Sequence, residues 1–149
     1  MPAILLVAHA PLASSLRDVA AHVYPDCGRL LVALDVDPAA SSEQVAAQVR
    51  AALAALGERE ALILADVFGA TPCNAALECA DGVRVRVVSG VNVPMLWRAL
   101  CYANLSLDEL VARAVAGGTQ GVMQVGAARR QNQASPPADD DQVQHQHQQ

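Results

Sequence analysis

Apolar and polar positions along the chain follow two alternating patterns, which predicts alternating strands and helices. Four short runs rich in Val, Ile and Leu are separated by segments in which apolar residues have helical spacing. The runs cover residues 3–8, 29–36, 61–67 and 83–89. Such alternation is typical of βαβ units around a parallel sheet. We therefore expect an α/β fold with a single doubly wound domain, in which the four strands take the order 2-1-3-4.

Five helices are predicted between and after these strands. Capping boxes start the second helix at Ser41 and the fifth at Ser106. The third is expected to begin near Pro72 and the fourth near Pro94, because proline favours the first helical turn. The first helix carries an apolar stripe that we expect to be buried, formed by Leu12, Leu16, Val19 and Val23.

After the fifth helix, the sequence pattern predicts a short strand and then a polar tail. Gly117 and Gly118 are expected to end the fifth helix, and residues 120–125 then alternate weakly, which predicts a fifth strand at a sheet edge or paired with another chain. Residues 127–149 are mostly Gln, Asp, Pro and His, too polar to offset the entropy of ordering. We expect a folded domain over residues 1–126 and a disordered tail over 127–149.

Composition excludes several classes of function. The 53% apolar and 17% charged residues are typical of a compact globular protein. A net charge of −5, with only one Trp, two Tyr and one Phe, argues against a nucleic-acid partner. All ten basic residues are Arg, so mechanisms that need a lysine ammonium are excluded.

The cysteines and the apolar runs indicate the cellular compartment in which the protein is expected. The four cysteines form no CxxC pair, which argues against a zinc site, and reduced thiols indicate a cytoplasmic protein. No run approaches the 18 apolar residues of a membrane span, so no membrane insertion is expected.

A histidine and an aspartate follow two strands that the predicted order makes neighbours. His9 follows the first strand and Asp66 ends the third. Neighbouring strands lie about 4.8 Å apart, and ligands of doubly wound sheets bind at the carboxyl ends of the strands. The Asp66 carboxylate would accept a hydrogen bond from Nδ1 of His9 and leave the Nε2 lone pair exposed, which suits a base or a nucleophile.

Three predicted helices begin at this same edge of the sheet, near Pro11, Pro72 and Pro94. Helix amino ends carry unpaired N–H groups and about half a positive charge, so together they favour a small dianion such as a phosphoryl group. Gly69 permits a tight turn, and Thr71 is placed to cap the third helix and to offer its hydroxyl. The phosphate-binding residues that we predict are Ala10, Gly69, Thr71 and Asn92.

Each candidate also has a purely structural interpretation. A single histidine is often a surface residue, and an aspartate at a strand end often belongs to a turn. Asp35 and Asp37 follow the second strand and are either substrate contacts or solvated loop acids. Cys73 lies near a helix amino end, where a thiol can be reactive, but a buried structural thiol is preferred. The functional interpretation is favoured because so many candidates share one edge of the sheet.

Three segments carry a family resemblance: residues 4–10 (ILLVAHA), 66–76 (DVFGATPCNAA) and 89–96 (SGVNVPML). In this order and spacing they resemble the mannose-type enzyme IIA proteins of the bacterial phosphoenolpyruvate-dependent sugar phosphotransferase system, over about residues 3–126. The resemblance implies that His9 is phosphorylated, that Asp66 orients it and that Thr71 lies near the phosphate. It also implies a homodimer in which the last strand pairs with the partner's sheet.

Two positions depart from the family pattern. Ala10-Pro11 follows the histidine where the family commonly has Gly, and Ala70 stands where a second Gly is frequent. Both alanines are tolerated if their φ angles stay negative.

The expected function is that of a phosphotransferase, a phosphohistidine carrier without metal or cofactor. It would accept a phosphoryl group on His9 from the histidine phosphocarrier protein and pass it to a separate IIB protein. Leu12, Phe68 and Met95 are expected to form the docking surface. Two alternatives stay open: a regulatory binding module that is phosphorylated without onward transfer, and the phosphotransferase subunit of a dihydroxyacetone kinase.

Overall fold

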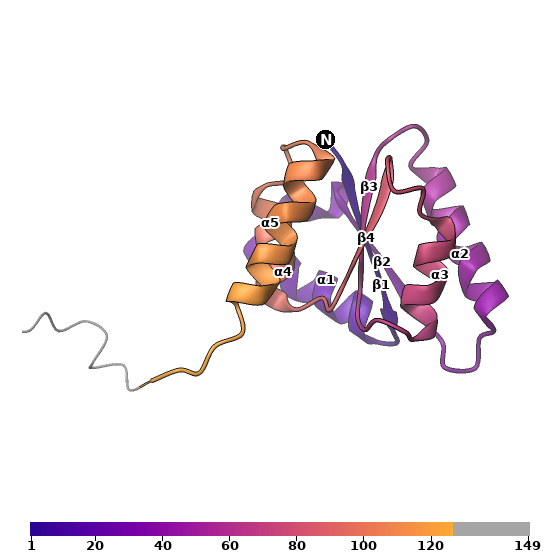
Figure 1. The fold of residues 1–149 in the computed structure, drawn as a ribbon, viewed down its shortest axis with the longest axis horizontal. Coiled ribbons are helices and arrows are strands. Elements are labelled where there is room, and N and C mark those ends of the chain that lie inside the picture. Colours follow the sequence, from indigo (N-terminus) through magenta and orange to yellow (C-terminus); the bar gives the residue numbers. More distant parts are fainter. Residues whose placement is uncertain (127–149) are drawn as a thin grey trace, which may run out of the picture.

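The computed structural model describes residues 1–126 and contains one four-stranded parallel sheet (Figure 1). Its strand order is β2-β1-β3-β4, which confirms the predicted order. The strands are β1 (Ala3–His9), β2 (Leu31–Val36), β3 (Ala61–Ala65) and β4 (Val85–Ser89). The helices are α1 (Leu12–Val23), the 3-10 helix η1 (Pro25–Arg29), α2 (Ser42–Ala55), α3 (Thr71–Cys79), α4 (Val93–Cys101) and α5 (Leu107–Gln120).

Helices cover both faces of the sheet (Figure 1). One core lies between the sheet and α1, α4 and α5, and includes Leu6, Leu64 and Leu110. The other lies between the sheet and α2 and α3, and includes Leu5, Ile63 and Val45. Since β1 and β3 are enclosed on both faces, nearly every residue of these two strands is buried, as expected for the centre of a parallel sheet.

Both predicted capping boxes are present. The Ser41 and Ser106 hydroxyls accept from the backbone N–H of Gln44 and Glu109, and the Gln44 and Glu109 side chains accept from the N–H groups of the two serines. The reciprocal bonds satisfy two amino-terminal N–H groups of each helix.

The predicted buried stripe of α1 is wrong by about one residue. The residues that face the sheet are Ala13, Leu16 and Ala20. Leu12, Val19 and Val23 remain 39%, 42% and 51% exposed. Alanine at two of the three contact positions lets α1 lie close to the sheet, and this packing decides between two apolar stripes that the sequence pattern leaves similar.

The predicted end of α5 is also wrong, because the helix continues through Gly117 and Gly118 to Gln120. These glycines are needed for packing rather than for termination. A Cβ at position 117 would lie 2.6 Å from Cβ of Arg98, and one at position 118 would lie 2.7 Å from Cε of Met95. The two helices α4 and α5 therefore approach more closely than side chains would permit.

Residues 122–126 form no strand in this single chain, so the predicted fifth strand is absent from it. Pairing of this segment with another chain stays a prediction, and the expected disordered tail lies outside the described residues. Among residues 1–126, no helix is long and apolar enough to cross a membrane.

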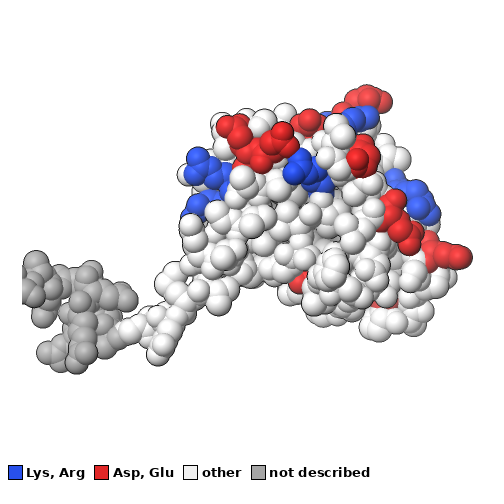
Figure 2. Space-filling model, in the orientation of Figure 1, with Lys and Arg blue, Asp and Glu red and all other residues white. Residues whose placement is uncertain are grey.

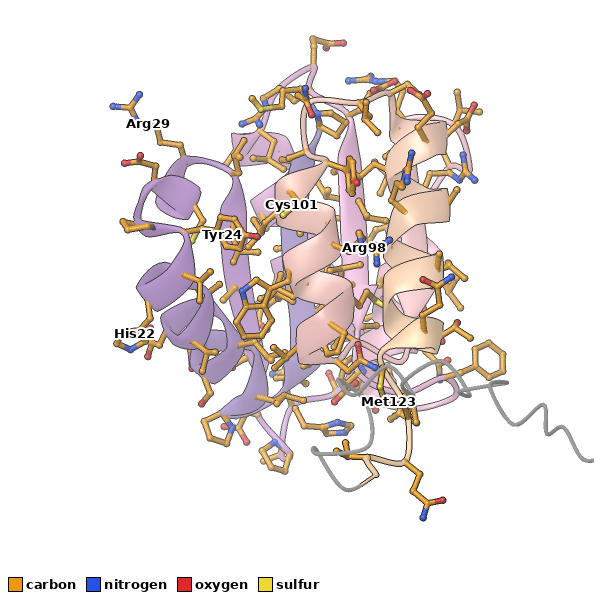
Figure 3. The ribbon with its side chains drawn as sticks, turned by 90° about the vertical axis from the view of Figure 1, so that its left-hand side faces the viewer. His22, Tyr24, Arg29, Arg98, Cys101 and Met123 are labelled. Atoms are coloured by element: carbon orange, nitrogen blue, oxygen red, sulfur yellow. The ribbon has the colours of Figure 1, made fainter. Side chains whose placement is uncertain are left out.

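Side-chain contacts also tie the helices of one face together. The Tyr24 hydroxyl, at the end of α1, lies 2.6 Å from Sγ of Cys101 in α4, and Figure 3 shows the two side chains pointing toward one another. This contact lies away from the carboxyl ends of the strands.

Candidate active site

His9 and Asp66 meet at the carboxyl ends of β1 and β3, as the strand order predicts. Nδ1 of His9 lies 2.6 Å from Oδ2 of Asp66, and the same oxygen accepts the backbone N–H of His9 at 2.9 Å. An ionised carboxylate only accepts hydrogen bonds, so Nδ1 carries the hydrogen and the Nε2 lone pair stays free. The His9 side chain is 46% exposed and that of Asp66 10%. The His9 ring is therefore accessible while the Asp66 carboxylate is sheltered.

Asp66 is held as a carboxylate by three hydrogen bonds. Burial by itself would raise the pKa of Asp66, but donation from the His9 backbone, the His9 ring and the Val67 backbone outweighs it and lowers the pKa. The Val67 N–H lies 2.8 Å from Oδ1. One carboxylate oxygen thus faces His9 and the other is bound by its own turn, which fixes the plane of the group.

The amino end of α1, beside His9, is capped by a residue of another element. The helix has no side-chain cap of its own, since Pro11 is its N-cap residue. Asp35 of β2 instead accepts the Ser14 N–H at 3.0 Å and the Ser14 hydroxyl at 2.5 Å. Asp35 is therefore not a solvated loop acid, and its two oxygens are not both free to contact a substrate. No pattern in the sequence indicates its pairing with Ser14.

The amino end of α4 is capped as well. Oδ1 of Asn92 accepts the Met95 N–H at 2.9 Å, and Nδ2 donates to the Gly118 carbonyl at 3.1 Å. The two polar atoms of the Asn92 side chain therefore join α4 to α5. The backbone N–H of Ala10, another predicted phosphate contact, donates to the Val36 carbonyl at 3.0 Å.

The amino end of α3 differs from those of α1 and α4, because no side chain caps it. Its N-cap residue is Ala70, and Thr71 is the first helical residue rather than the predicted cap. Gly69, at φ 92°, makes the turn that precedes the helix, and its carbonyl accepts from Nδ2 of Asn74 at 3.3 Å. Within the described part of the chain, no hydrogen bond uses the Thr71 hydroxyl. Uncapped N–H groups and this hydroxyl are suited to bind an anion.

Two further expectations concern Ala70 and Cys73. Ala70 has φ −91°, so the absence of the family's second glycine causes no strain. Cys73 is buried, which raises the pKa of its thiol despite a hydrogen bond from the Gly69 backbone. The preferred interpretation of Cys73 as a structural thiol is therefore confirmed.

A family model supplies the decisive comparison. The model described as "PTS system fructose IIA component" matches residues 3–115. The chain belongs to this family of IIA components.

A curated relative agrees with this assignment, and two solved structures share the fold. The chain is 36% identical over 109 residues to the "PTS system mannose-specific EIIAB component" of Escherichia coli, which covers 70% of the chain and 34% of that protein. It thus spans about a third of the length of the curated relatives it matches. The mannose/sorbose-specific IIA subunit from Enterococcus faecalis has a TM-score of 0.78 at 24% identity, covering 85% of this chain and 96% of that one. An EIIA component from Streptococcus agalactiae has a TM-score of 0.75 at 22% identity, covering 83% and 97%.

Three apolar residues that follow His9 or Asp66 closely in the sequence of this IIA component are exposed. Leu12, Val67 and Phe68 are 39%, 51% and 75% exposed. Met95, which we expected at the same surface, is instead buried under α5, because the glycines of that helix leave room for it. On the face drawn in Figure 2, charged side chains gather in the upper and right-hand parts, while the lower part is mostly uncharged.

Metal ligands are not gathered at this site. Across residues 1–126, no group of three or more His, Cys, Asp or Glu side chains is arranged to hold a metal ion. The side chains of His9 and Asp66 bind one another, which suits nucleophilic chemistry at Nε2.

Proposed function

We propose that this protein is a phosphohistidine carrier that accepts a phosphoryl group on Nε2 of His9 from the histidine phosphocarrier protein and passes it to a histidine of a IIB protein. The observation that carries the proposal is the 2.6 Å contact between Nδ1 of His9 and Oδ2 of Asp66. It leaves the nitrogen that faces solvent as the nucleophile. Membership in a family of phosphotransferase system components supports the same conclusion.

The transfer needs positioning rather than proton chemistry. The Nε2 lone pair attacks the phosphorus, the bond from phosphorus to the donor histidine breaks, and its electron pair stays on the donor nitrogen. The proton on Nδ1 remains in its hydrogen bond to Asp66, which stabilises the positive charge that the ring gains. Onward transfer to the IIB histidine reverses these roles.

The loop before α3 is the best-suited phosphate contact in this proposal. The amino ends of α1 and α4 are bound by Asp35 and Asn92, whereas that of α3 is uncapped. The N–H and hydroxyl of Thr71 therefore remain for the phosphoryl oxygens, and Gly69 would join them only by giving up its bond to the Cys73 thiol. Ala10 and Asn92, also proposed as contacts, would have to give up their present bonds.

The exposed apolar residues that follow His9 and Asp66 in the sequence support the docking step. Leu12 and Phe68 would pack against the donor or acceptor protein and exclude water from the phosphorylated imidazole, which slows its hydrolysis. The four cysteines are free thiols, which fits the cytoplasm as the place of action.

The first test is labelling with radioactive phosphoenolpyruvate, enzyme I and the phosphocarrier protein. We expect the wild-type protein to take up acid-labile, alkali-stable phosphate and His9→Ala to take up none. His22→Ala is the matched control, because His22 is exposed on α1 (Figure 3) and has no partner role in the proposal. Label that persists in His9→Ala would refute the assignment.

A second experiment tests onward transfer. The phosphorylated protein is mixed with a cognate IIB protein, and the label is followed on both chains. Transfer within seconds supports a carrier. Label retained on His9 would instead favour a regulatory module that is phosphorylated without passing the group on.

A further inference from the structure

The turn that carries His9 is fixed to both neighbouring strands. On the β3 side, the His9 N–H donates to Asp66. On the β2 side, the Ala10 N–H donates to the Val36 carbonyl at 3.0 Å. Only Ala10 and Pro11 separate β1 from α1, so the orientation of His9 depends on how the amino end of α1 is held.

Asp35 holds that amino end from a position beside the turn. In the register of the sheet, Asp35 lies opposite Ala8, the residue before His9. Its two oxygens accept the N–H and the hydroxyl of Ser14, in the first turn of α1. The Ser14 hydroxyl also lies 3.2 Å from the Pro11 carbonyl, so Ser14 connects β2 directly to the turn.

The charge of Asp35 is well matched to this position. Burial would raise the pKa of Asp35, but the Ser14 hydroxyl, the Ser14 and Ala13 N–H groups and the Arg17 charge lower it. The carboxylate is therefore ionised near neutral pH and occupies the positive end of the α1 dipole. It takes the N–H groups beside His9 that would otherwise attract a second anion.

We propose that Asp35, acting through Ser14, is a positioning residue for the phosphorylation of His9. The inference rests on the proposed carrier function and adds a role for a residue that touches neither His9 nor the phosphoryl group. This contact of Asp35 with Ser14, the clamp, holds the turn that carries His9 so that the exposed ring keeps its hydrogen bond to Asp66. It also keeps the phosphoryl group from binding at the end of α1.

Substitutions at Asp35 and Ser14 separate the contributions of the charge and of the hydrogen bonds. Asp35→Ala removes both bonds and the charge, and Asp35→Asn keeps an acceptor but removes the charge. Ser14→Ala removes the hydroxyl contacts with Asp35 and the Pro11 carbonyl but keeps the backbone N–H bond to Asp35. Asp37→Ala is the matched control, because Asp37 lies two residues further along and, within residues 1–126, its carboxylate accepts from no other element, only from the Ala39 N–H of its own turn at 2.8 Å. It changes the net charge by the same amount.

The first readout is the rate of His9 phosphorylation by the phosphorylated carrier protein. We expect Asp35→Ala to lower kcat about tenfold, with the KM for the donor protein within about twofold of wild type, since the clamp lies behind the docking surface. Asp35→Asn and Ser14→Ala should fall between this variant and wild type, while Asp37→Ala should match wild type. A kcat of Asp35→Ala equal to that of Asp37→Ala, or a loss confined to KM, would overturn the proposal.

The second readout does not depend on phosphoryl transfer. Nitrogen NMR reports which ring nitrogen of His9 carries the hydrogen, and titration with inorganic phosphate reports which backbone amides bind it. We expect Asp35→Ala to weaken the preference for the Nδ1–H form and to shift the Ala13 and Ser14 amides on addition of phosphate, unlike wild type. Unchanged ring nitrogens together with unresponsive amides would overturn the proposal, even if wild type is phosphorylated normally.

Other variants serve the test if one of them fails to fold. If Asp35→Ala does not fold, Ser14→Ala and Asp35→Asn carry the same test, since each keeps one of the two interactions. Failure of wild type to be phosphorylated at all would refute the carrier function, while the NMR readout would still decide whether Asp35 positions His9.

Discussion

At the scale of single residues, the proposed chemistry depends on one carboxylate that contacts both the backbone and the ring of one histidine. Oδ2 of Asp66 accepts two hydrogen bonds from His9, so the ring and the turn beneath it are oriented together. A residue that only fixed the tautomer would leave the backbone free to move. The double contact explains why a 46% exposed side chain still has a defined direction.

Asp66→Asn should slow phosphoryl transfer while leaving the fold intact. The amide oxygen can still accept from His9 but has no charge to stabilise the phosphorylated ring, so we expect the transfer rate to fall about 10- to 100-fold. Single-turnover transfer from the phosphocarrier protein measures the effect. An unchanged rate would show that the carboxylate serves only its own turn.

The lowered pKa of Asp66 also predicts how stability depends on pH. A carboxyl whose pKa is lower in the folded than in the unfolded state stabilises the fold fully above its unfolded pKa, about 3.9, and loses that contribution as pH falls through the folded value. Urea unfolding between neutral pH and pH 3 should therefore show a smaller acid-induced loss for Asp66→Asn than for wild type. Equal losses in the two proteins would contradict the lowered pKa.

At the scale of elements, α4 and α5 form the tightest contact between two helices. Gly121, the C-cap residue of α5, has ordinary helical angles, so alanine causes no backbone strain there. Its Cβ would nevertheless overlap the ring of Pro94, in the first turn of α4. The glycine is therefore required by packing, which no pattern of apolar spacing reveals.

Gly121→Ala should destabilise the protein by about 1–2 kcal/mol through overpacking. The midpoint of urea unfolding measures the change. Gly28→Ala is the control, because a Cβ at position 28 meets no atom within 4 Å. Equal midpoints for the two variants would mean that α5 moves aside freely.

The sequence predicts the order of the elements but not how closely the helices pack on the sheet. The strand order and the His9–Asp66 pair were predictable, because both depend only on alternating patterns and on the neighbours that a doubly wound sheet imposes. The rotation of α1 was not, since Ala13 and Ala20 are weakly apolar and their burial depends on how closely the helix approaches the sheet. The Asp35–Ser14 contact was not predictable, because the two residues lie 21 positions apart and meet only through the folded geometry of their side chains.

At the scale of the whole molecule, the segment after α5 leaves apolar side chains uncovered. Val122, Met123 and Val125 are 76%, 69% and 78% exposed, and Met123 lies at the end of the molecule where α5 ends (Figure 3). One edge of the sheet, at β4, has no further strand paired to it in the described chain. These two features support the proposal of a homodimer in which this segment pairs with the partner's sheet.

Val122→Asp should therefore weaken self-association at least about tenfold, because a charge would be placed in an apolar interface. Sedimentation over a range of concentrations measures the dimer dissociation constant. Val83→Asp is the control, since Val83 is 72% exposed and follows the Asp81 turn at the other end of the sheet. A monomeric wild-type protein, or two variants that associate equally, would contradict the homodimer.

The burial of β1 and β3 on both faces has a consequence for how the protein meets its partners. His9 ends β1 and Asp66 directly follows β3, and these two strands are paired and buried. The distance between imidazole and carboxylate is therefore set by the sheet and not by the surface that a partner protein would contact. Movement of the surrounding helices when another protein binds would therefore leave the position of the His9 ring unchanged. In the proposed carrier function, one fixed site would thus serve both the donor and the acceptor protein.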